Sequence, residues 1–242
     1  MRTSVDRAWA NLLVVAGAAA LLTGCPSYSS MTTAKPVTPG RVEFAISPGA
    51  IGLNASALGG SDTAETYILP TVDFGVRYGF HERFDAGLQL SGWGNFGLDG
   101  KINFVDSEVF ALAFDPSLNG TFISVGKVDA GFIQFQTPLL IDLAPADWVR
   151  FTLGPRYVGL SAFAAAEGEA NSNYSSFVGS SLGVEFVIND TVRLQPHGGV
   201  VTWVNNPDDE GVFLFTGGLA IKLRFGKADK PEPVADGRAP AE

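Results

Sequence analysis

The feature that most constrains this chain is an alternation of apolar and polar residues that recurs from residue 41 to residue 225. In the stretch TVDFGVRY, the apolar Phe74, Val76 and Tyr78 alternate with Asp73 and Arg77. Successive side chains of a β-strand point to opposite faces, so a period of two predicts strands with one apolar and one polar face. The same pattern appears in RVEFAIS, FDAGLQLS, IQFQTPLLID, VRFTLGPRY and TGGLAIKLRF. The chain is therefore predicted to be all-β.

Turn signals divide this region into about ten predicted strands. Their ranges are 41–52, 67–79, 84–93, 97–105, 108–115, 125–142, 148–164, 174–187, 191–205 and 212–225. Tight connections are predicted at 80–83, 105–108, 143–147 and 188–190, and longer polar ones near 53–65, 116–124, 165–173 and 206–211. Short and long connections therefore alternate along the chain, although the gap at 94–96 is shorter than this pattern requires.

Composition narrows the class of protein. Charged residues make up 17% of the chain, below the usual ~25%, and the 29 glycines exceed the usual ~7%. No run of 18 apolar residues follows Cys25, so no transmembrane helix is expected there. The formal net charge of −9, without a basic stripe, argues against nucleic acid as a partner. A soluble all-β domain and a transmembrane barrel remain.

An even number of strands, with short turns at one end and longer loops at the other, resembles the layout of bacterial outer-membrane β-barrels. The stretch TGGLAIKLRF, which ends at Phe225, resembles the closing strand of such barrels. It departs from them because residues 226–242 follow. The resemblance implies an antiparallel up-and-down transmembrane barrel of about ten strands. Its implied partners are outer-membrane lipid and the barrel assembly machinery.

Alternation alone does not decide which face is outside, so a soluble barrel or sandwich with an apolar core stays an alternative. The polar faces carry few charges, and Glu185 can face Arg193 across a hairpin, both of which favour a membrane barrel. Aromatic residues near the predicted strand ends resemble interfacial girdles. They are Tyr67, Tyr78, Phe80, Phe84, Trp93, Phe96, Trp148, Phe163, Trp203, Phe213 and Phe225.

The polar faces supply the candidate site, a charge network in the lumen. A barrel of about ten strands is narrow, because about eight strands leave an interior that side chains fill. We therefore expect paired charges that plug the lumen, with a narrow solute path as the alternative. The predicted lumenal residues are Glu43, Asp73, Arg77, Asp85, Lys101, Arg150, Arg156, Glu185, Arg193, Lys222 and Arg224.

Catalysis is not expected. With the 188–190 turn, His197 would lie opposite Ser181 near Glu185, the residue types of an acyl hydrolase. However, no G-x-S-x-G elbow is present, and a lumenal Ser181 would not reach lipid. The acidic stretch NPDDEG lacks the full ligand spacing of a calcium loop, and SALGGSDTAE lacks the lysine of a phosphate loop. No metal and no cofactor are predicted.

The N-terminus indicates export. Arg2 and Arg7 precede an apolar run from Leu12 to Leu22, which is typical of a secretory signal peptide. The following Thr-Gly-Cys resembles the lipobox of bacterial lipoproteins. This resemblance implies that lipoprotein-processing enzymes acylate Cys25, for example with palmitate, and that it becomes the mature N-terminus. Because Pro26 replaces an aspartate of the inner-membrane retention signal, the outer membrane is the implied destination.

The predicted domains are a signal peptide (1–24), a flexible tether (25–40), the barrel (41–225) and a disordered tail (226–242). A single cysteine leaves no partner for an intrachain disulfide. The function expected is that of a lipid-anchored outer-membrane barrel, with both termini periplasmic. Its role would be structural, adhesive or narrow small-solute transport. The alternative is a soluble, lipid-anchored periplasmic β-barrel or sandwich that binds an apolar ligand.

Overall fold

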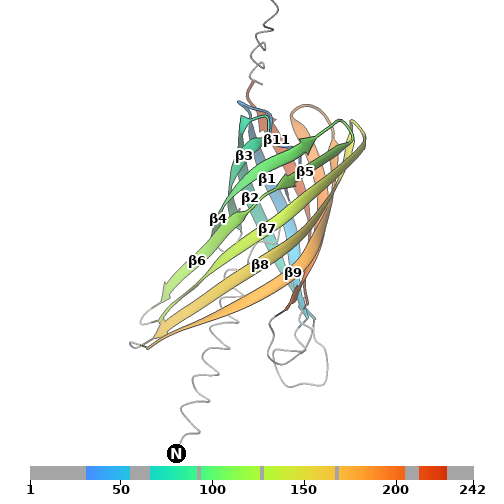
Figure 1. Ribbon diagram of the computed structural model, residues 1–242. Coiled ribbons are helices and arrows are strands. Elements are labelled where there is room, and N and C mark those ends of the chain that lie inside the picture. The colour runs from blue at the N-terminus through green and yellow to red at the C-terminus, as the bar shows by residue number, and fades with distance from the viewer. Residues whose placement is uncertain are drawn as a thin grey trace, which may run out of the picture.

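The computed structural model describes residues 31–54, 66–91, 94–125, 128–166, 169–204 and 213–227 (Figure 1). These residues form eleven strands in one antiparallel sheet. The strands are β1 (Val42–Asn54), β2 (Thr66–His81), β3 (Phe84–Ser91), β4 (Asn95–Asp106), β5 (Phe110–Phe114), β6 (Ser117–Val125), β7 (Val128–Ala146), β8 (Val149–Ala166), β9 (Glu169–Val187), β10 (Val192–Trp203) and β11 (Phe213–Phe225).

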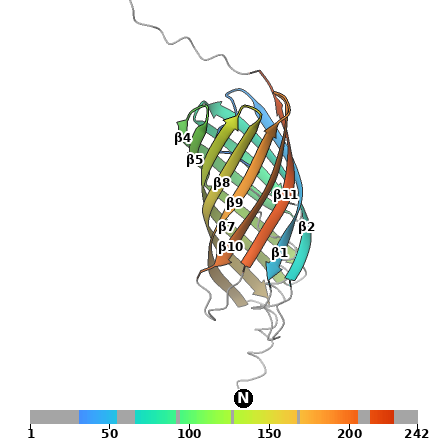
Figure 2. The same ribbon diagram turned by 90° about the vertical axis from the view of Figure 1, so that its right-hand side faces the viewer.

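The sheet closes into a barrel. Apart from β5 and β6, strands that are consecutive in the chain pair with each other, and β1 pairs with β11 from Val42↔Phe225 to Leu53↔Leu214. Strands β5 and β6 share one position between β4 and β7, so the eleven strands fill ten positions around the barrel. The predicted antiparallel up-and-down barrel of about ten strands is confirmed. Figures 1 and 2 show the strands tilted strongly against the barrel axis.

The predicted connection at 116–124 is wrong. The stretch 116–124 was expected to be a longer polar loop, but β6 occupies Ser117–Val125 and continues the register that β5 makes with β7. Pro116 cannot donate a hydrogen bond, and the strand is interrupted at this residue rather than ended. The Asn119-Gly120 step is not a turn, because Asn119 is buried inside the barrel while its strand continues.

The two ends of the barrel differ. At one end, here called the turn end, residues 82–83, 107–109, 147–148 and 188–191 join consecutive strands. Val42 and Phe225 also lie there, and the opposite end is called the far end. The loop predicted at 165–173 is mostly strand, because β8 runs to Ala166 and β9 begins at Glu169. The short gap before β4 is a far-end turn in which Gly94 has a φ of +89°.

The distribution of apolar and polar side chains between the outside and the inside of the barrel is the reverse of that in a soluble barrel. Large apolar side chains face outward over all strands, and Ile68 and Phe122 are 66% and 65% exposed. The largest fully buried side chains instead include Lys101, Lys222 and Glu185. The alternative of a barrel with an apolar core is therefore wrong for the described residues. None of the described residues forms a helix long and apolar enough to cross a membrane.

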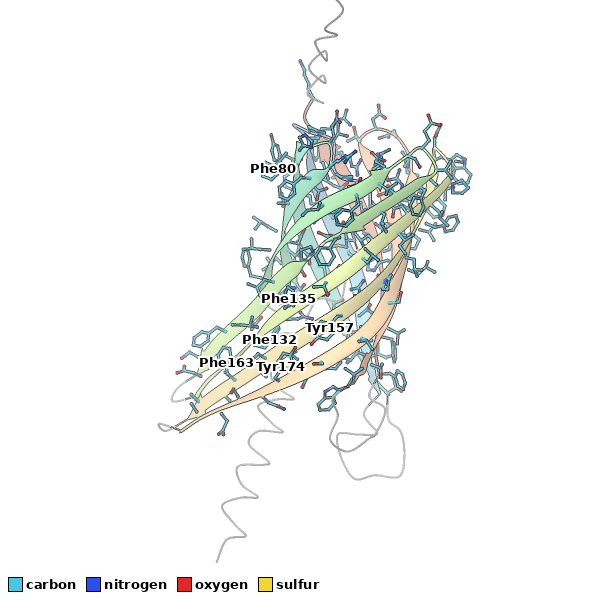
Figure 3. All side chains as sticks on the ribbon, in the orientation of Figure 1. Phe80, Phe132, Phe135, Tyr157, Phe163 and Tyr174 are labelled. Carbon is cyan, nitrogen blue, oxygen red and sulfur yellow. The ribbon has the colours of Figure 1, made fainter. Side chains whose placement is uncertain are left out.

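Aromatic side chains lie on the outside near both ends (Figure 3). Near the turn end, Phe80 contacts Tyr78 and Phe84 at ring-centroid distances of 4.7 and 5.7 Å. Toward the far end, the Phe163 ring stacks on Phe122 at 6.4 Å. Among the members of the expected girdle whose side chains the structure describes, which leaves out Tyr67 and Trp93, one is wrong. Trp203 packs against an inner apolar cluster of Val158, Phe177, Val201 and Leu214.

Strands β6–β9 extend beyond the others at the far end (Figure 1). The β9–β10 ladder ends at Phe177↔Trp203, whereas β8 and β9 continue to pair as far as Ala166↔Glu169. A transmembrane strand needs about 9–11 residues, and β7, β8 and β9 have 19, 18 and 19. Part of these strands therefore extends past the length that a membrane crossing needs, as a small sheet (Figure 1).

Candidate functional site in the barrel lumen

The polar faces of the strands meet inside the barrel. Of the eleven charged residues predicted for the lumen, nine are buried and two, Arg150 and Arg193, are half-buried. They occupy one parity of each strand, for example Asp73 and Arg77 on β2 and Lys222 and Arg224 on β11. Because the opposite parity carries the outward apolar residues, the same alternation sets both surfaces.

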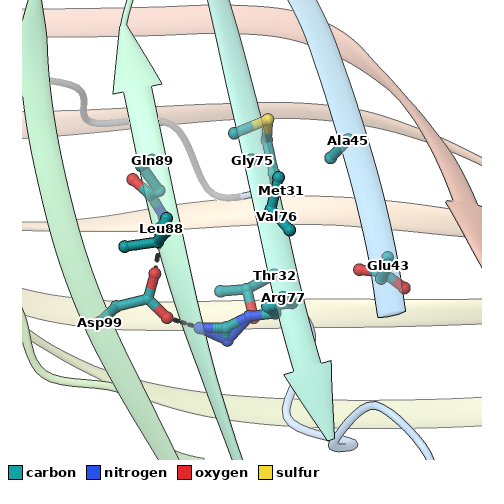
Figure 4. Close-up of a pocket in the computed structure, with 10 residues that line it drawn as sticks. All are labelled: Met31, Thr32, Glu43, Ala45, Gly75, Val76, Arg77, Leu88, Gln89 and Asp99. Atoms are coloured by element: carbon teal, nitrogen blue, oxygen red, sulfur yellow. Dashed lines mark hydrogen bonds and ion pairs between the residues drawn. The ribbon is translucent and has the colours of Figure 1, made fainter. Parts of the chain in front are cut away.

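The first cluster surrounds Arg77 of β2, which Figure 4 shows beside one of its partners, Asp99. Its guanidinium donates to Asp85 at 2.9 Å and to Asp115 at 3.1 Å, and it contacts Asp99. Lys101 of β4 lies 3.0 Å from the second oxygen of Asp85. Two cations and three carboxylates thus occupy one level of the lumen, and each buried charge has a partner of opposite sign.

The second cluster surrounds Glu185 of β9. Its two oxygens accept separate bonds, one from Lys222 at 2.9 Å and one from Arg193 at 2.8 Å. Beside it, Arg224 donates to Glu43 at 2.5 Å across the β1–β11 ladder. Glu43 is also the register partner of Arg77, so the two clusters adjoin across β1 and β2.

Asp142 of β7 organises a third, smaller group. It accepts from the Thr152 hydroxyl at 2.7 Å, and Arg150 lies 3.6 Å away. Of the remaining predicted residues, Arg156 contacts the Ser181 hydroxyl. Asp73 lines a small cavity together with His197.

The structure does not bring Ser181 and His197 together as the sequence predicted. The Ile188 N–H donates to the Val192 carbonyl, and the turn comprises 189–191, which pairs His197 with Gly183. The Nε2 atom of His197 instead lies 2.8 Å from Ser47 Oγ, and Ser181 contacts Arg156. Among the described residues no group of three or more His, Cys, Asp or Glu side chains could hold a metal ion.

Sequence reasoning missed three lumenal carboxylates, Asp99, Asp115 and Asp142. Asp99 precedes Lys101 by two residues on one strand, so the period of two could have placed it in the lumen. Asp142 was assigned to a polar face but not to the network. Asp115 was the last residue of a predicted strand, and its lumenal position became clear only because β6 continues past it.

An unexpected occupant of the lumen is the segment 31–37. The sequence predicted a flexible tether as far as residue 40, but Ala34 and Val37 are 0% and 1% exposed. The segment approaches the turn end from inside, because Met31 lies beside Gly75 whereas Gly40 donates its N–H to Gly79. The predicted lipid-attachment residue, Cys25, and the predicted signal peptide lie outside the described residues.

The cavities between the described lumenal side chains are small. One cavity of ≈ 20 Å³ is lined by Met31, Arg77 and Asp99 among others (Figure 4). A second, also ≈ 20 Å³, lies between Asp115 and Arg156. The cavity beside Asp73 and His197 measures ≈ 10 Å³. A water molecule needs a cavity of about 10–15 Å³, so each of these cavities has room for about one water.

Comparisons with known proteins concern the fold. No model of a known protein family matches the sequence, and no curated protein matches it. Among solved structures, the attachment invasion locus protein Ail of Yersinia pestis is 12% identical with a TM-score of 0.38. That match covers 77% of this chain and 99% of Ail.

Two further structures show similar values. Neisserial surface protein A is 14% identical with a TM-score of 0.40, over 78% of this chain and 99% of that one. The outer membrane protease OmpT of Escherichia coli is 9% identical with a TM-score of 0.44, over 82% and 100%. Because all three TM-scores are below 0.5, the fold class rests on this structure itself. The β1–β11 pairing closes the sheet into a barrel, and the large apolar side chains face outward.

Proposed function

We propose that this chain is a lipid-anchored β-barrel of the bacterial outer membrane that serves as a closed scaffold with a structural or adhesive role. The observation that carries this proposal is the packed lumen. Paired charges and the segment 31–37 fill the turn-end half, and the cavities beside them measure ≈ 20 Å³ or less. A hydrated ion or small solute needs a wider path than this.

The outward apolar surface supports a membrane location. Side chains such as Phe44, Leu98 and Leu182 are 46–55% exposed and would be costly to place in water. Short turns are periplasmic in outer-membrane barrels, so the turn end, with Phe225, would face the periplasm. The far end would then face outward, where the projecting part of β6–β9 offers a surface for adhesion.

Acylation of Cys25 would give the chain a second attachment to the membrane. The motif Leu22-Thr23-Gly24-Cys25 supports it, and Pro26 supports sorting to the outer membrane. Mass spectrometry of the protein purified from membranes tests this point directly. A peptide that begins at an acylated Cys25 is expected, whereas an N-terminus at another residue contradicts lipidation.

Recording ion conductance in planar lipid bilayers tests the closed scaffold. The purified wild-type protein is expected to give no stable conductance steps, at amounts at which an open porin gives them. Slower migration after boiling, in a detergent gel, verifies that the sample is a folded barrel. Reproducible conductance of the folded wild-type protein would contradict the proposal and favour the narrow transport role.

A further inference from the structure

The segment 31–37 is held mainly through its main chain. The Lys35 N–H donates to Asp142 Oδ2 at 3.2 Å, and the Val37 N–H donates to Asp85 Oδ2 at 2.7 Å. The Ala34 carbonyl accepts from the Asn103 amide at 3.1 Å. Pro36, which has no N–H, lies between Lys35 and Val37, so its missing donor costs the segment neither of these two hydrogen bonds. A residue that precedes proline also favours an extended backbone, so the local sequence suits this arrangement.

The wall of the barrel is shaped to admit this segment. A Cβ atom on Gly79 would lie only 2.5 Å from the Thr38 carbonyl oxygen, and it would also collide with the Val37 carbonyl. On the other side, Ala34 packs against Ala111, Ala113 and Leu140. Small wall residues thus leave room for a second layer of chain, which larger side chains would fill.

Side chains of the segment add little to this recognition. The Lys35 ammonium lies 3.2 Å from Asp106, but both side chains are more than one third exposed, so the pair is weak. The Thr32 hydroxyl accepts from Lys101 at 3.2 Å. The Asp85 and Asp142 carboxylates, in contrast, are buried and bind the segment and the barrel together. A buried carboxylate that loses such a hydrogen-bond donor carries an uncompensated desolvation penalty. Asp85 and Asp142 are therefore more stable when residues 31–37 are bound beside them.

We propose that residues 31–37 are a tethered peptide ligand of the lumen, bound through their extended main chain, and that this ligand closes the turn-end half of the barrel to solutes. The seat comprises Gly79, Asp85, Asn103, Ala111, Ala113 and Asp142. The ligand it takes is an extended peptide with N–H donors two residues apart. This inference rests on the closed lumen of the proposed function and names the element that closes it.

Thiol labelling in the full chain tests the seat. In a Cys25→Ser background, Ala34→Cys places one thiol on the buried segment, and a membrane-impermeant maleimide reports its exposure. Gly79→Val should expel the segment and raise the labelling rate by about tenfold or more. The matched control is Gly217→Val, because a Cβ atom there meets its first neighbour at 3.9 Å. This control should leave the labelling rate unchanged.

Three results would overturn the inference. Fast labelling of Ala34→Cys without a second change would show that the segment is not held. Slow labelling in folded Gly79→Val would show that the seat does not select it. Exposure of the thiol without ion conductance would show that the segment does not close the lumen. Ala113→Leu, which fills the seat from the opposite wall, provides a second variant if Gly79→Val does not fold.

The two proposals fail differently. Conductance of the wild-type barrel contradicts the closed scaffold itself. Equal labelling of the Gly79→Val and Gly217→Val barrels contradicts only the role of residues 31–37. Conductance that appears in Gly79→Val, together with faster labelling, supports the peptide ligand as the closing element.

Discussion

At the scale of single residues, the lumen depends on carboxylates that each serve two partners. Glu185 is 0% exposed, and its two oxygens accept from Lys222 and Arg193. Desolvation of a lone buried charge costs several kcal/mol, so the arrangement is stable only while each charge keeps a partner. The loss of one such carboxylate would leave buried cations without compensation.

Glu185→Gln should therefore lower the free energy of unfolding by about 3–5 kcal/mol. Urea unfolding in detergent micelles, followed by the heat-dependent gel shift, measures the change. Asp106→Asn is the control, because both side chains of the Lys35–Asp106 pair are more than one third exposed and the pair should contribute only about 0.2–1 kcal/mol. Equal losses in the two variants would contradict the role of the buried cluster.

Much of the lumenal site follows from residue parity. Arg77 and Glu185 could be assigned to the inner face because each lies on a strand with clear alternation. The face on which Asp115 lies could not be assigned, because in the sequence Pro116 looks like the end of its strand. The seat of residues 31–37 could not be predicted at all. Five strands build it, and no local pattern in MTTAKPV indicates burial.

At the scale of elements, the β9–β10 hairpin shows how one side chain fixes a register. The Asn189 side-chain oxygen accepts from the Thr191 and Val192 N–H groups at 2.9 and 2.8 Å. This Asx turn places the three-residue connection at 189–191, one residue later than predicted, which moves His197 from Ser181 to Gly183. Arg193 still reaches Glu185, its diagonal neighbour across the hairpin, at 2.8 Å.

Asn189→Ala removes both of these hydrogen bonds and should destabilise the barrel by about 1–2 kcal/mol. Asp190→Ala, at the neighbouring exposed position, should change stability by less than about 0.5 kcal/mol. The midpoint of the heat-dependent gel shift compares the two variants. An unchanged midpoint in Asn189→Ala would mean that the strands, and not the turn, set the register.

The strands themselves were largely predictable, because a period of two is a direct consequence of backbone geometry. The errors fell where polar turn residues lie inside a strand. Asn119-Gly120 has the composition of a hairpin turn, yet the β6–β7 and β4–β6 ladders hold it in extended form. Tertiary pairing outweighed the local propensity there, as is common in sheets.

At the scale of the whole molecule, the outward apolar surface and the proposed acyl chain are two separate attachments. A barrel with this apolar outer surface stays in the bilayer without a covalently attached acyl chain. Cys25→Ser should therefore remain in the membrane pellet after a carbonate wash. Immunoblots of pellet and supernatant measure this, with a lipid-anchored soluble protein as the control for release. Appearance of the Cys25→Ser protein in the supernatant would contradict a transmembrane barrel.

The closing ladder has a consequence for the order in which the molecule is assembled. Glu43 and Arg224 are 181 residues apart in sequence, so their contact is among the last that the growing chain can make. Every residue that seats the segment 31–37 precedes residue 147. Contacts between distant parts of a chain form slowly. The segment 31–37 can thus bind to β2–β7 before the barrel closes. It can then act as a template for the curvature of this sheet, to which β8–β11 are added later.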